Sequence, residues 1–281
     1  MIMKYFKPTT ASKRGSVGIL YRDILTKTEP EKNLTKGFKR AVGRNSAGRI
    51  TVRHKGGGAK RLYREIDFKY DKKDIPATIK SVEYDPNRSG FIGVLAYADG
   101  EKRYTLLPTT IKVNDKIIVS EKAEIKPGNR LPLGKIPVGT FVYNVEAQPM
   151  SGAKLVRSAG SFAEILAHDN NYALIKMPST EIRKIPDSAW ASIGQVSNEE
   201  YKLRNLGKAG RSRHMGRRPT VRGSAMNPVD HPFGGGEGRQ GAGMRRPKNM
   251  WGKGIRGKKT RSPKKYSNPF IVSRRKNKNK K

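Results

Sequence analysis

His231 directly follows Asp230, and this pair comes nearest to a set of residues that could do chemistry. A carboxylate can orient an imidazole that acts as a general base. Sequence adjacency does not place two side chains in that geometry, and no serine or cysteine nucleophile is positioned to complete it. We therefore expect no catalytic residue, with His231 as the one candidate. We interpret it as a histidine that caps a turn or hydrogen-bonds a binding partner.

Metal and thiol chemistry are excluded more directly. The chain has no cysteine, which rules out zinc ribbons, disulfide frameworks and thiol nucleophiles. The four histidines are scattered without the spacing of metal ligands, at His54, His168, His214 and His231. The phosphate-binding pattern GxxxxGK followed by Ser or Thr does not occur. We expect no metal site and no cofactor bound by the protein itself.

The composition indicates a polyanionic partner. The 281 residues include 60 Lys and Arg against 23 Asp and Glu, a formal net charge of +37. Repulsion on this scale disfavours a compact isolated state, and nucleic acid offsets it because each phosphate contact releases condensed counterions. A membrane is not indicated, since there is no apolar run of about 18 residues and no amphipathic basic helix. Residues 1–10 lack the features of a secretory signal, so we expect a cytoplasmic protein.

Two stretches hold most of the positive charge. Residues 201–281 contain 25 Lys and Arg with only Asp230 and Glu237 as acids, and residues 32–64 contain no acid. Residues 209–250 are rich in Gly, Arg and Pro, so burial cannot offset the entropy of ordering them without a partner. Residues 232–238 cannot form a regular helix or strand. We expect them to form a loop threaded into folded RNA.

The region between these stretches, residues 62–196, predicts short strands separated by turns. A first group is expected at residues 66–70, 77–84, 91–97, 103–107 and 117–119, with a hairpin at Asp99-Gly100. After a Pro- and Gly-rich joint, a second group is expected at residues 141–145, 161–167, 172–177, 181–185 and 192–196. This pattern is typical of two small β-barrels or sandwiches in tandem.

Several basic segments contain glycine or turn residues. Residues 43–58 interleave arginines with glycines, so the backbone can approach RNA closely while arginine grips phosphates or stacks on bases. Arg88 follows an Asp-Pro-Asn turn, and Arg157 precedes a predicted strand. Each predicted barrel therefore carries one loop arginine as a possible RNA contact.

Together these segments resemble the universal large-subunit ribosomal protein L-two family in its bacterial type. The resemblance rests on residues 48–58, 85–88, 99–104, 206–211 and 226–239. It implies an all-β fold with an OB-fold barrel followed by an SH3-like β-barrel and long basic irregular extensions. The implied bounds are 1–60 for the N-terminal extension, 61–125 for the OB-fold-like barrel, 126–200 for the SH3-like barrel and 201–281 for the C-terminal extension.

The resemblance also implies a function. It implies a structural constituent of the large ribosomal subunit and not an enzyme: a primary rRNA binder that supports subunit association, tRNA binding and the peptidyl-transferase region. Arg88 and Arg157 match family arginines implicated in rRNA binding, and His231 matches a family histidine that has been proposed to take part in peptidyl transfer. The full set of RNA-binding residues expected is Arg44, Arg49, Arg53, His54, Lys55, Arg61, Arg88, Arg157, Lys208, Arg211, Arg213, Arg217, Arg218, Arg222, His231, Arg239, Arg245 and Arg246.

The partners implied are all ribosomal. They are large-subunit rRNA, small-subunit rRNA at an intersubunit bridge, other ribosomal proteins and nearby tRNA. We expect no homo-oligomer. Any structural Mg²⁺ is expected to be held mainly by rRNA.

The sequence departs from the family pattern at two places. Phe233 stands where the family's histidine-proline-histidine motif has its second histidine, and a family tryptophan is replaced around His214 and Met215. Phe233 can still stack on a base, but a scheme that needs a second imidazole there does not fit this chain.

Two hypotheses from other classes of protein compete with the ribosomal one. A DNA-compacting, histone-like protein needs charge alone, but the Lys- and Ala-rich helical repeats typical of that class are absent. An enzyme with His231 as general base is the other hypothesis. Competition between duplex DNA and structured rRNA tests the first, and the activity of ribosomes carrying His231→Ala tests the second.

Overall fold

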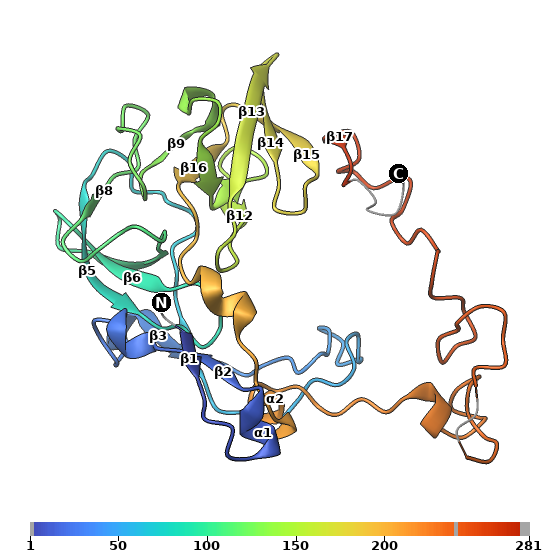
Figure 1. Ribbon diagram of the computed structural model, residues 1–281. Helices are drawn as coiled ribbons and strands as arrows, with labels where there is room; N and C mark the ends of the chain where they lie inside the picture. The colour runs from blue at the N-terminus through green and yellow to red at the C-terminus, as the bar shows by residue number, and fades with distance from the viewer. Residues whose placement is uncertain (1–2, 239–240, 276–281) are drawn as a thin grey trace. The chain divides into compact units, whose positions relative to one another are not determined.

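Two antiparallel β-sheets, of four and seven strands, are the main regular elements of the computed structural model, which describes residues 3–238 and 241–275 (Figure 1). The described chain divides into two units. The first unit contains residues 3–39, 60–208 and 269–275. The second unit contains Arg40–Ala59 and the described residues of Ala209–Asn268. Both sheets belong to the first unit.

The first sheet is the OB-fold-like barrel predicted from the sequence. Its strand order is β7-β6-β5-β8, with β5 at Ala77–Glu83, β6 at Ile92–Tyr97, β7 at Lys102–Leu106 and β8 at Lys116–Ile117. A register shift between Ile79 and Ser81 interrupts the pairing of β5 with β6, and such bulges bend a strand and help a sheet to curl. Ile79, Leu95 and Leu107 are buried in its core.

The second sheet is the SH3-like barrel, and its order is β17-β15-β14-β13-β10-β16-β9. Its strands are β9 at Arg130–Pro132, β10 at Phe141–Tyr143, β13 at Ala163–Asp169, β14 at Tyr172–Lys176, β15 at Ile182–Pro186, β16 at Trp190–Ile193 and β17 at Ile271–Ser273. Asn170 and Asn171 join β13 to β14 with φ angles of 47° and 63°. Positive φ at both central residues is what a tight hairpin turn between twisted strands requires.

Short elements surround the sheets. The described residues also form three two-stranded antiparallel sheets. They pair β1 at Met3–Tyr5 with β2 at Val17–Ile19, β3 at Thr35–Gly37 with β4 at Leu62–Arg64, and β11 at Val145–Glu146 with β12 at Ala153–Leu155. The helices are α1 at Ala11–Arg14, α2 at Ala209–His214, and the 3-10 turns η1 at Tyr21–Asp23, η2 at Lys32–Leu34, η3 at Leu133–Lys135, η4 at Glu199–Leu203 and η5 at Gly223–Ala225. Within the described ranges, no helix has the length and apolarity needed to cross a membrane.

The predicted strand at residues 66–70 is wrong. Ile66 makes a single bridge to Tyr104, and the following residues form no strand. The Asp67 carboxylate accepts the backbone N–H groups of Lys69 and Tyr70, each at 2.9 Å, and Tyr70 has a φ of 54°. A side chain that binds its own backbone two and three residues on replaces the sheet ladder with a turn. The period-two alternation of apolar and polar residues therefore does not correspond to a strand here.

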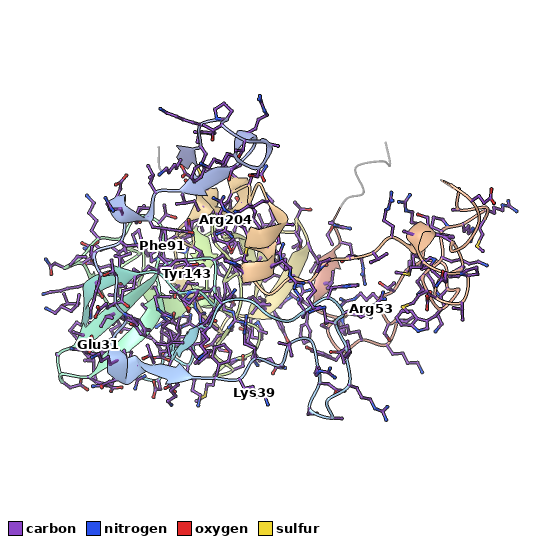
Figure 2. All side chains as sticks on the ribbon, turned by 90° about the horizontal axis from the view of Figure 1, so that it is seen from below. Glu31, Lys39, Arg53, Phe91, Tyr143 and Arg204 are labelled. Atoms are coloured by element: carbon purple, nitrogen blue, oxygen red, sulfur yellow. The ribbon has the colours of Figure 1, made fainter. Side chains whose placement is uncertain are left out.

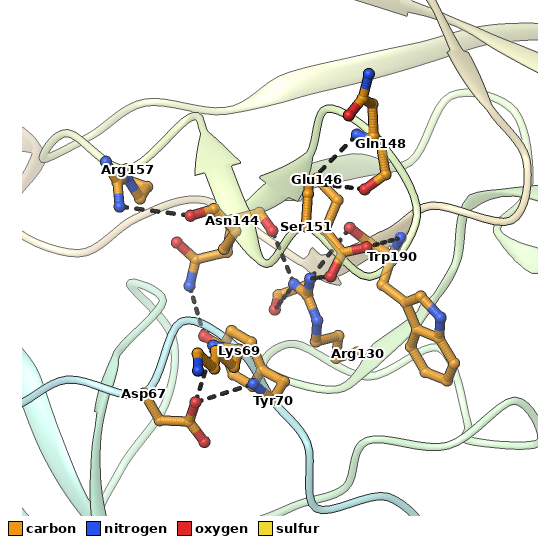
Figure 3. Close-up of polar contacts among 12 residues, drawn as sticks. Asp67, Lys69, Tyr70, Arg130, Asn144, Glu146, Gln148, Ser151, Arg157 and Trp190 are labelled. Atoms are coloured by element: carbon orange, nitrogen blue, oxygen red, sulfur yellow. Dashed lines mark hydrogen bonds and ion pairs between the residues drawn. The ribbon is translucent and has the colours of Figure 1, made fainter.

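A buried ion pair lies where the two sheets meet (Figure 3). Arg130 on β9 is 1% exposed and Glu146 on β11 is 3% exposed, and the Arg130 Nη2 donates to the Glu146 Oε1 at 2.9 Å. The other carboxylate oxygen accepts the Trp190 backbone N–H at 3.3 Å. The guanidinium also donates to the carbonyl oxygens of Asn144 and Trp190, at 2.7 and 3.3 Å. Both charges are thus hydrogen-bonded on several sides, which a charge removed from water requires.

Tyr70 carries this network into the first sheet. Its ring centroid lies 4.3 Å from the Arg130 guanidinium carbon. Its hydroxyl accepts a hydrogen bond from the Asn144 amide at 2.7 Å and shares a second hydrogen bond with the Thr105 hydroxyl on β7, 3.1 Å away. Burial raises the pKa of Tyr70, so the phenol is neutral at neutral pH. One cluster of polar contacts therefore joins the two barrels within the first unit.

Removing one partner of this ion pair should destabilise the first unit. Arg130→Met leaves the Glu146 carboxylate buried without its partner, so we expect the free energy of unfolding to fall by about 3–5 kcal/mol. The double variant Arg130→Met with Glu146→Leu should recover much of this loss, because no unpaired charge remains. Urea unfolding followed by tryptophan fluorescence measures both changes.

The matched control is an exposed ion pair. Lys135 Nζ lies 2.9 Å from the Glu121 Oε2, and both side chains are exposed. Lys135→Met should change the free energy of unfolding by less than about 1 kcal/mol. A loss for Arg130→Met no larger than this control would contradict the central role of the buried pair.

Candidate nucleic-acid interface

Arg88 is held by the turn that precedes it. The buried Asp85 carboxylate accepts the Asn87 backbone N–H at 2.8 Å and the Arg88 Nε at 2.5 Å. The Arg61 guanidinium donates to the Pro86 carbonyl oxygen at 2.8 Å from the other side. Arg88 is therefore a fixed cation, because a buried carboxylate restricts its side chain. Arg61, also predicted to bind RNA, contributes at least one donor to this turn.

Arg157 follows β12 on the other barrel. It is exposed, and its Nη1 lies 3.4 Å from the Ala153 carbonyl oxygen. The preceding Val156 has a φ of 55°, so the chain turns sharply at this point. The loop directs Arg157 toward the segment that precedes the first sheet.

The two arginines meet on one aromatic ring. The guanidinium carbon of Arg88 lies 5.4 Å from the Phe68 ring centroid, and that of Arg157 lies 4.6 Å from the same centroid. Both distances are within the range of cation–π attraction. The ring thus holds two cations from different barrels close together, where mutual repulsion would otherwise separate them.

The position of Phe68 depends on contacts from both sides. Asp67 shapes the turn that follows it, and the Phe68 carbonyl oxygen accepts the Ala153 backbone N–H at 2.7 Å. A Cβ on Gly152 would lie 2.7 Å from this carbonyl oxygen, and Gly152 has a φ of +72°. Only glycine lets β12 approach so closely. The sequence did not indicate Phe68 as a site residue, because period-two alternation places it on the apolar face of a strand.

Several acids of the first unit are paired with its own cations, as around Arg103. Arg103 donates to Asp67 at 2.9 Å and to Glu101 at 2.6 Å, and it also contacts Asp71. Hydrogen bonds from Arg103 lower the pKa values of Asp71 and Glu101. These carboxylates stay ionised at neutral pH and neutralise part of the barrel charge.

The second unit has too few acids to neutralise its cations in the same way. It contains 21 Lys and Arg residues and only two acids, Asp230 and Glu237. Nitrogen-bearing side chains project from its backbone, with Arg53 among them (Figure 2). Apart from α2 and η5, its described residues between 209 and 250 form no helix or strand. A unit with this charge needs a polyanion more than it needs a protein partner of mixed charge.

Five of the predicted RNA-binding residues surround one hollow in the second unit. This space of about 410 Å³ is lined by residues that include Arg44, Arg53, His54, Lys55 and Arg218. The backbone of residues 54–58 pairs with that of residues 214–218, which brings these sequence-distant segments together. The sequence identified these residues as basic, but not that they share a site.

The remaining predicted residues are more dispersed. Arg211 and Arg213 lie on α2, and Lys208 belongs to the first unit. The others among the described residues are exposed on loops, at Arg49, Arg217, Arg222, Arg245 and Arg246. Arg239 lies outside the described residues.

His231 caps a turn. Its Nδ1 accepts the Phe233 backbone N–H at 3.0 Å, so the neutral imidazole carries its proton on Nε2. The two rings lie 4.9 Å apart between centroids. The Gly235 N–H donates to the Met226 carbonyl oxygen at 3.1 Å and closes the loop.

This arrangement does not resemble a general base. The exposed Asp230 carboxylate makes no hydrogen bond to the His231 ring in the part of the chain that the structure describes. The nitrogen that Asp230 would have to orient is occupied by the backbone. Among the described residues, no three His, Asp or Glu side chains form a group that could hold a metal ion.

The arginine pair at Phe68 and the basic cluster of the second unit both suit the phosphates of RNA. These two sites define the class of the protein as a structural RNA-binding protein. Residues 31–119 match the family model described as Ribosomal Proteins L2, RNA binding N-terminal domain. Residues 126–252 match the model described as Ribosomal Proteins L2, C-terminal domain. Together these matches cover most of the chain.

The chain therefore belongs to the ribosomal protein L2 family. This is a family of structural rRNA-binding proteins of the large ribosomal subunit and not an enzyme family. The prediction of a non-enzymatic ribosomal protein is confirmed by this membership.

A close contact to the His231 ring predicts how the loop responds to substitution. A Cβ at Gly223 would lie 2.6 Å from ring atoms of His231. Gly223→Ala must therefore displace the imidazole, and we expect its NMR resonances to shift. Gly210→Ala on α2 is the control, because a Cβ there meets no atom within 4 Å. Unchanged His231 resonances in Gly223→Ala would contradict the described loop.

Proposed function

We propose that this chain holds together rRNA segments of the large subunit through two modes of contact. The first unit places a fixed pair of arginines, and the second unit neutralises crowded phosphates. The observation that carries the proposal is the convergence of Arg88 and Arg157 on the Phe68 ring.

The arginine pair is suited to recognise RNA at a defined position. Each guanidinium can donate two parallel hydrogen bonds to a phosphate or stack on a base. Asp85 and Phe68 hold Arg88 before RNA arrives, so less side-chain entropy is lost on binding. This site fixes the register of the barrels on the RNA.

The second unit is suited to enter the RNA interior. Its glycine-rich loops bring backbone close to a ligand, and its cations release counterions from the phosphates that they contact. Arg44, Arg53, His54, Lys55 and Arg218 act as one cluster in this proposal, and the exposed loop arginines act singly. Structural Mg²⁺ would be held mainly by the RNA.

The proposed roles of this chain within the ribosome rest on the family resemblance and on the loop around His231. We propose that residues 226–238 approach the peptidyl-transferase region and that the protein supports tRNA binding. We also propose that it supports subunit association through small-subunit rRNA at an intersubunit bridge, beside other ribosomal proteins in cytoplasmic ribosomes. His231 contributes by shaping this loop through Nδ1, which leaves the Nε2 proton directed away from that bond.

The salt dependence of rRNA binding tests the electrostatic part of this proposal. The affinity of the full chain for large-subunit rRNA fragments should fall steeply as KCl rises, and duplex DNA should bind more weakly. Arg88→Gln and Arg157→Gln should each reduce the slope of log affinity against log salt by about 1. A salt-insensitive interaction, or equal affinity for duplex DNA, would overturn it.

Phe68→Leu tests the ring that joins the arginines. The substitution keeps an apolar side chain but removes two cation–π contacts worth about 0.5–1 kcal/mol each at exposed sites. We expect rRNA affinity to fall about tenfold, with the salt slope unchanged because no cation is lost. The control is Phe162→Leu, since Phe162 pairs with Phe141 in the same unit and contacts neither arginine. Wild-type affinity for Phe68→Leu with an intact fold would contradict this role.

A further inference from the structure

The hollow in the second unit has a lining of two kinds. Residues 42–57 and Arg218 surround about 410 Å³, which lies in the size range of small-ligand pockets. Part of this lining is aliphatic and part is cationic. The two parts need different groups on a ligand, so together they restrict its chemistry.

Three aliphatic side chains of the lining are exposed. Val42, Ile50 and Val52 are 41%, 59% and 52% exposed. Single exposed aliphatic residues are normal on a protein surface. Three that line one hollow, in a unit dominated by charge, place a small apolar surface among its cations.

The cationic part surrounds these side chains without any acid. Arg44, Lys55 and Arg218 line the hollow, and none of its lining residues that the structure describes is an Asp or Glu. Arg53 also lines it, and its guanidinium carbon lies 5.5 Å from the ring centroid of Trp251, which is 67% exposed. This stack orients Arg53 and adds a flat aromatic surface beside it.

The backbone is built to bring the two parts together. The Gly43 carbonyl oxygen accepts the N–H groups of Thr51 and Val52, at 2.9 and 3.0 Å, and Arg44 bridges to Ile50. A Cβ on Gly43 would lie 2.1 Å from the Val52 carbonyl oxygen, so only glycine permits this closure. Val42 has a φ of 43°, which is strained for a β-branched residue and is the kind of conformation found at binding sites.

The lining excludes simpler ligands. An inorganic phosphate would satisfy the arginines and leave the aliphatic side chains in water. An apolar peptide would cover the aliphatic side chains and leave the charges unpaired. A nucleotide has both a flat base that is poorly solvated on its faces and a phosphate.

We propose that this hollow holds a single unstacked nucleotide of rRNA. Its base lies against Val42, Ile50 and Val52, and its phosphate is held by Arg44, Arg53 and Arg218. This inference rests on the proposed function, since large-subunit rRNA supplies the nucleotide. It adds base contact to a unit whose charge alone would bind any phosphate.

The test removes the aliphatic surface and keeps every charge. In the full chain, Ile50→Ser with Val52→Ser should weaken binding to large-subunit rRNA about tenfold, with an unchanged salt slope. Chemical probing of the bound rRNA should show one base that loses protection in the variant. The matched control, Val221→Ser with Ile255→Ser, changes two exposed aliphatic residues of the same unit outside the hollow and should bind normally.

The conservative variant Ile50→Leu with Val52→Ile should retain both the affinity and the protected base. Wild-type affinity and protection in the serine variant would overturn the nucleotide site while leaving the proposed function intact. If the serine variant lost affinity for a polyglutamate peptide and not for rRNA, the occupant would be an acidic protein segment, which also overturns the inference. Failure of the wild-type chain to prefer rRNA over duplex DNA would instead overturn the proposed function, and this inference with it.

Discussion

The buried pair of Arg130 and Glu146 is the constraint on which the rest of the first unit depends. Two charges removed from water are tolerated only when they are well hydrogen-bonded, and the groups involved come from β9, β11, β16 and Asn144 between β10 and β11. Through Tyr70 the same cluster extends to the first sheet, and Tyr70 lies two residues from Phe68. The ring that holds the two arginines is therefore positioned by a network in the protein interior. The surface site formed by Phe68, Arg88 and Arg157 is therefore positioned by contacts with buried residues.

Charge is divided between the two units according to what each must do. The barrels pair many of their acids with their own arginines and lysines, as around Arg103, so they can fold without excess repulsion. The second unit has 21 Lys and Arg residues against two acids, which favours association with phosphates. Glycine is used differently in the two units as well. In the barrels Gly152 allows one close backbone contact, whereas in the second unit Gly43 closes a loop around a hollow.

The loop around His231 illustrates how a residue pair suited to catalysis can have a structural role. Adjacent Asp and His residues suggest a general base, but the Nδ1 of His231 is already bound to the Phe233 backbone. Phe233 contributes a backbone donor and a neighbouring ring, neither of which needs a second imidazole. The contacts of His231 and Phe233 therefore fix the shape of this loop.

The sequence predicted the class of ligand, the all-β fold and the basic residues, because charge, glycine content and alternating hydrophobicity are local properties. It also located the Asp99-Gly100 hairpin, whose conformation depends on one or two residues. It misassigned residues 66–70, because a turn made by the Asp67 side chain has the same alternation as a strand. It could not show that Arg88 and Arg157 share the Phe68 ring, or that Arg218 joins Arg44 and Arg53 at one hollow. Those contacts join residues tens to more than a hundred positions apart, and only the packing of the folded chain decides which of them meet.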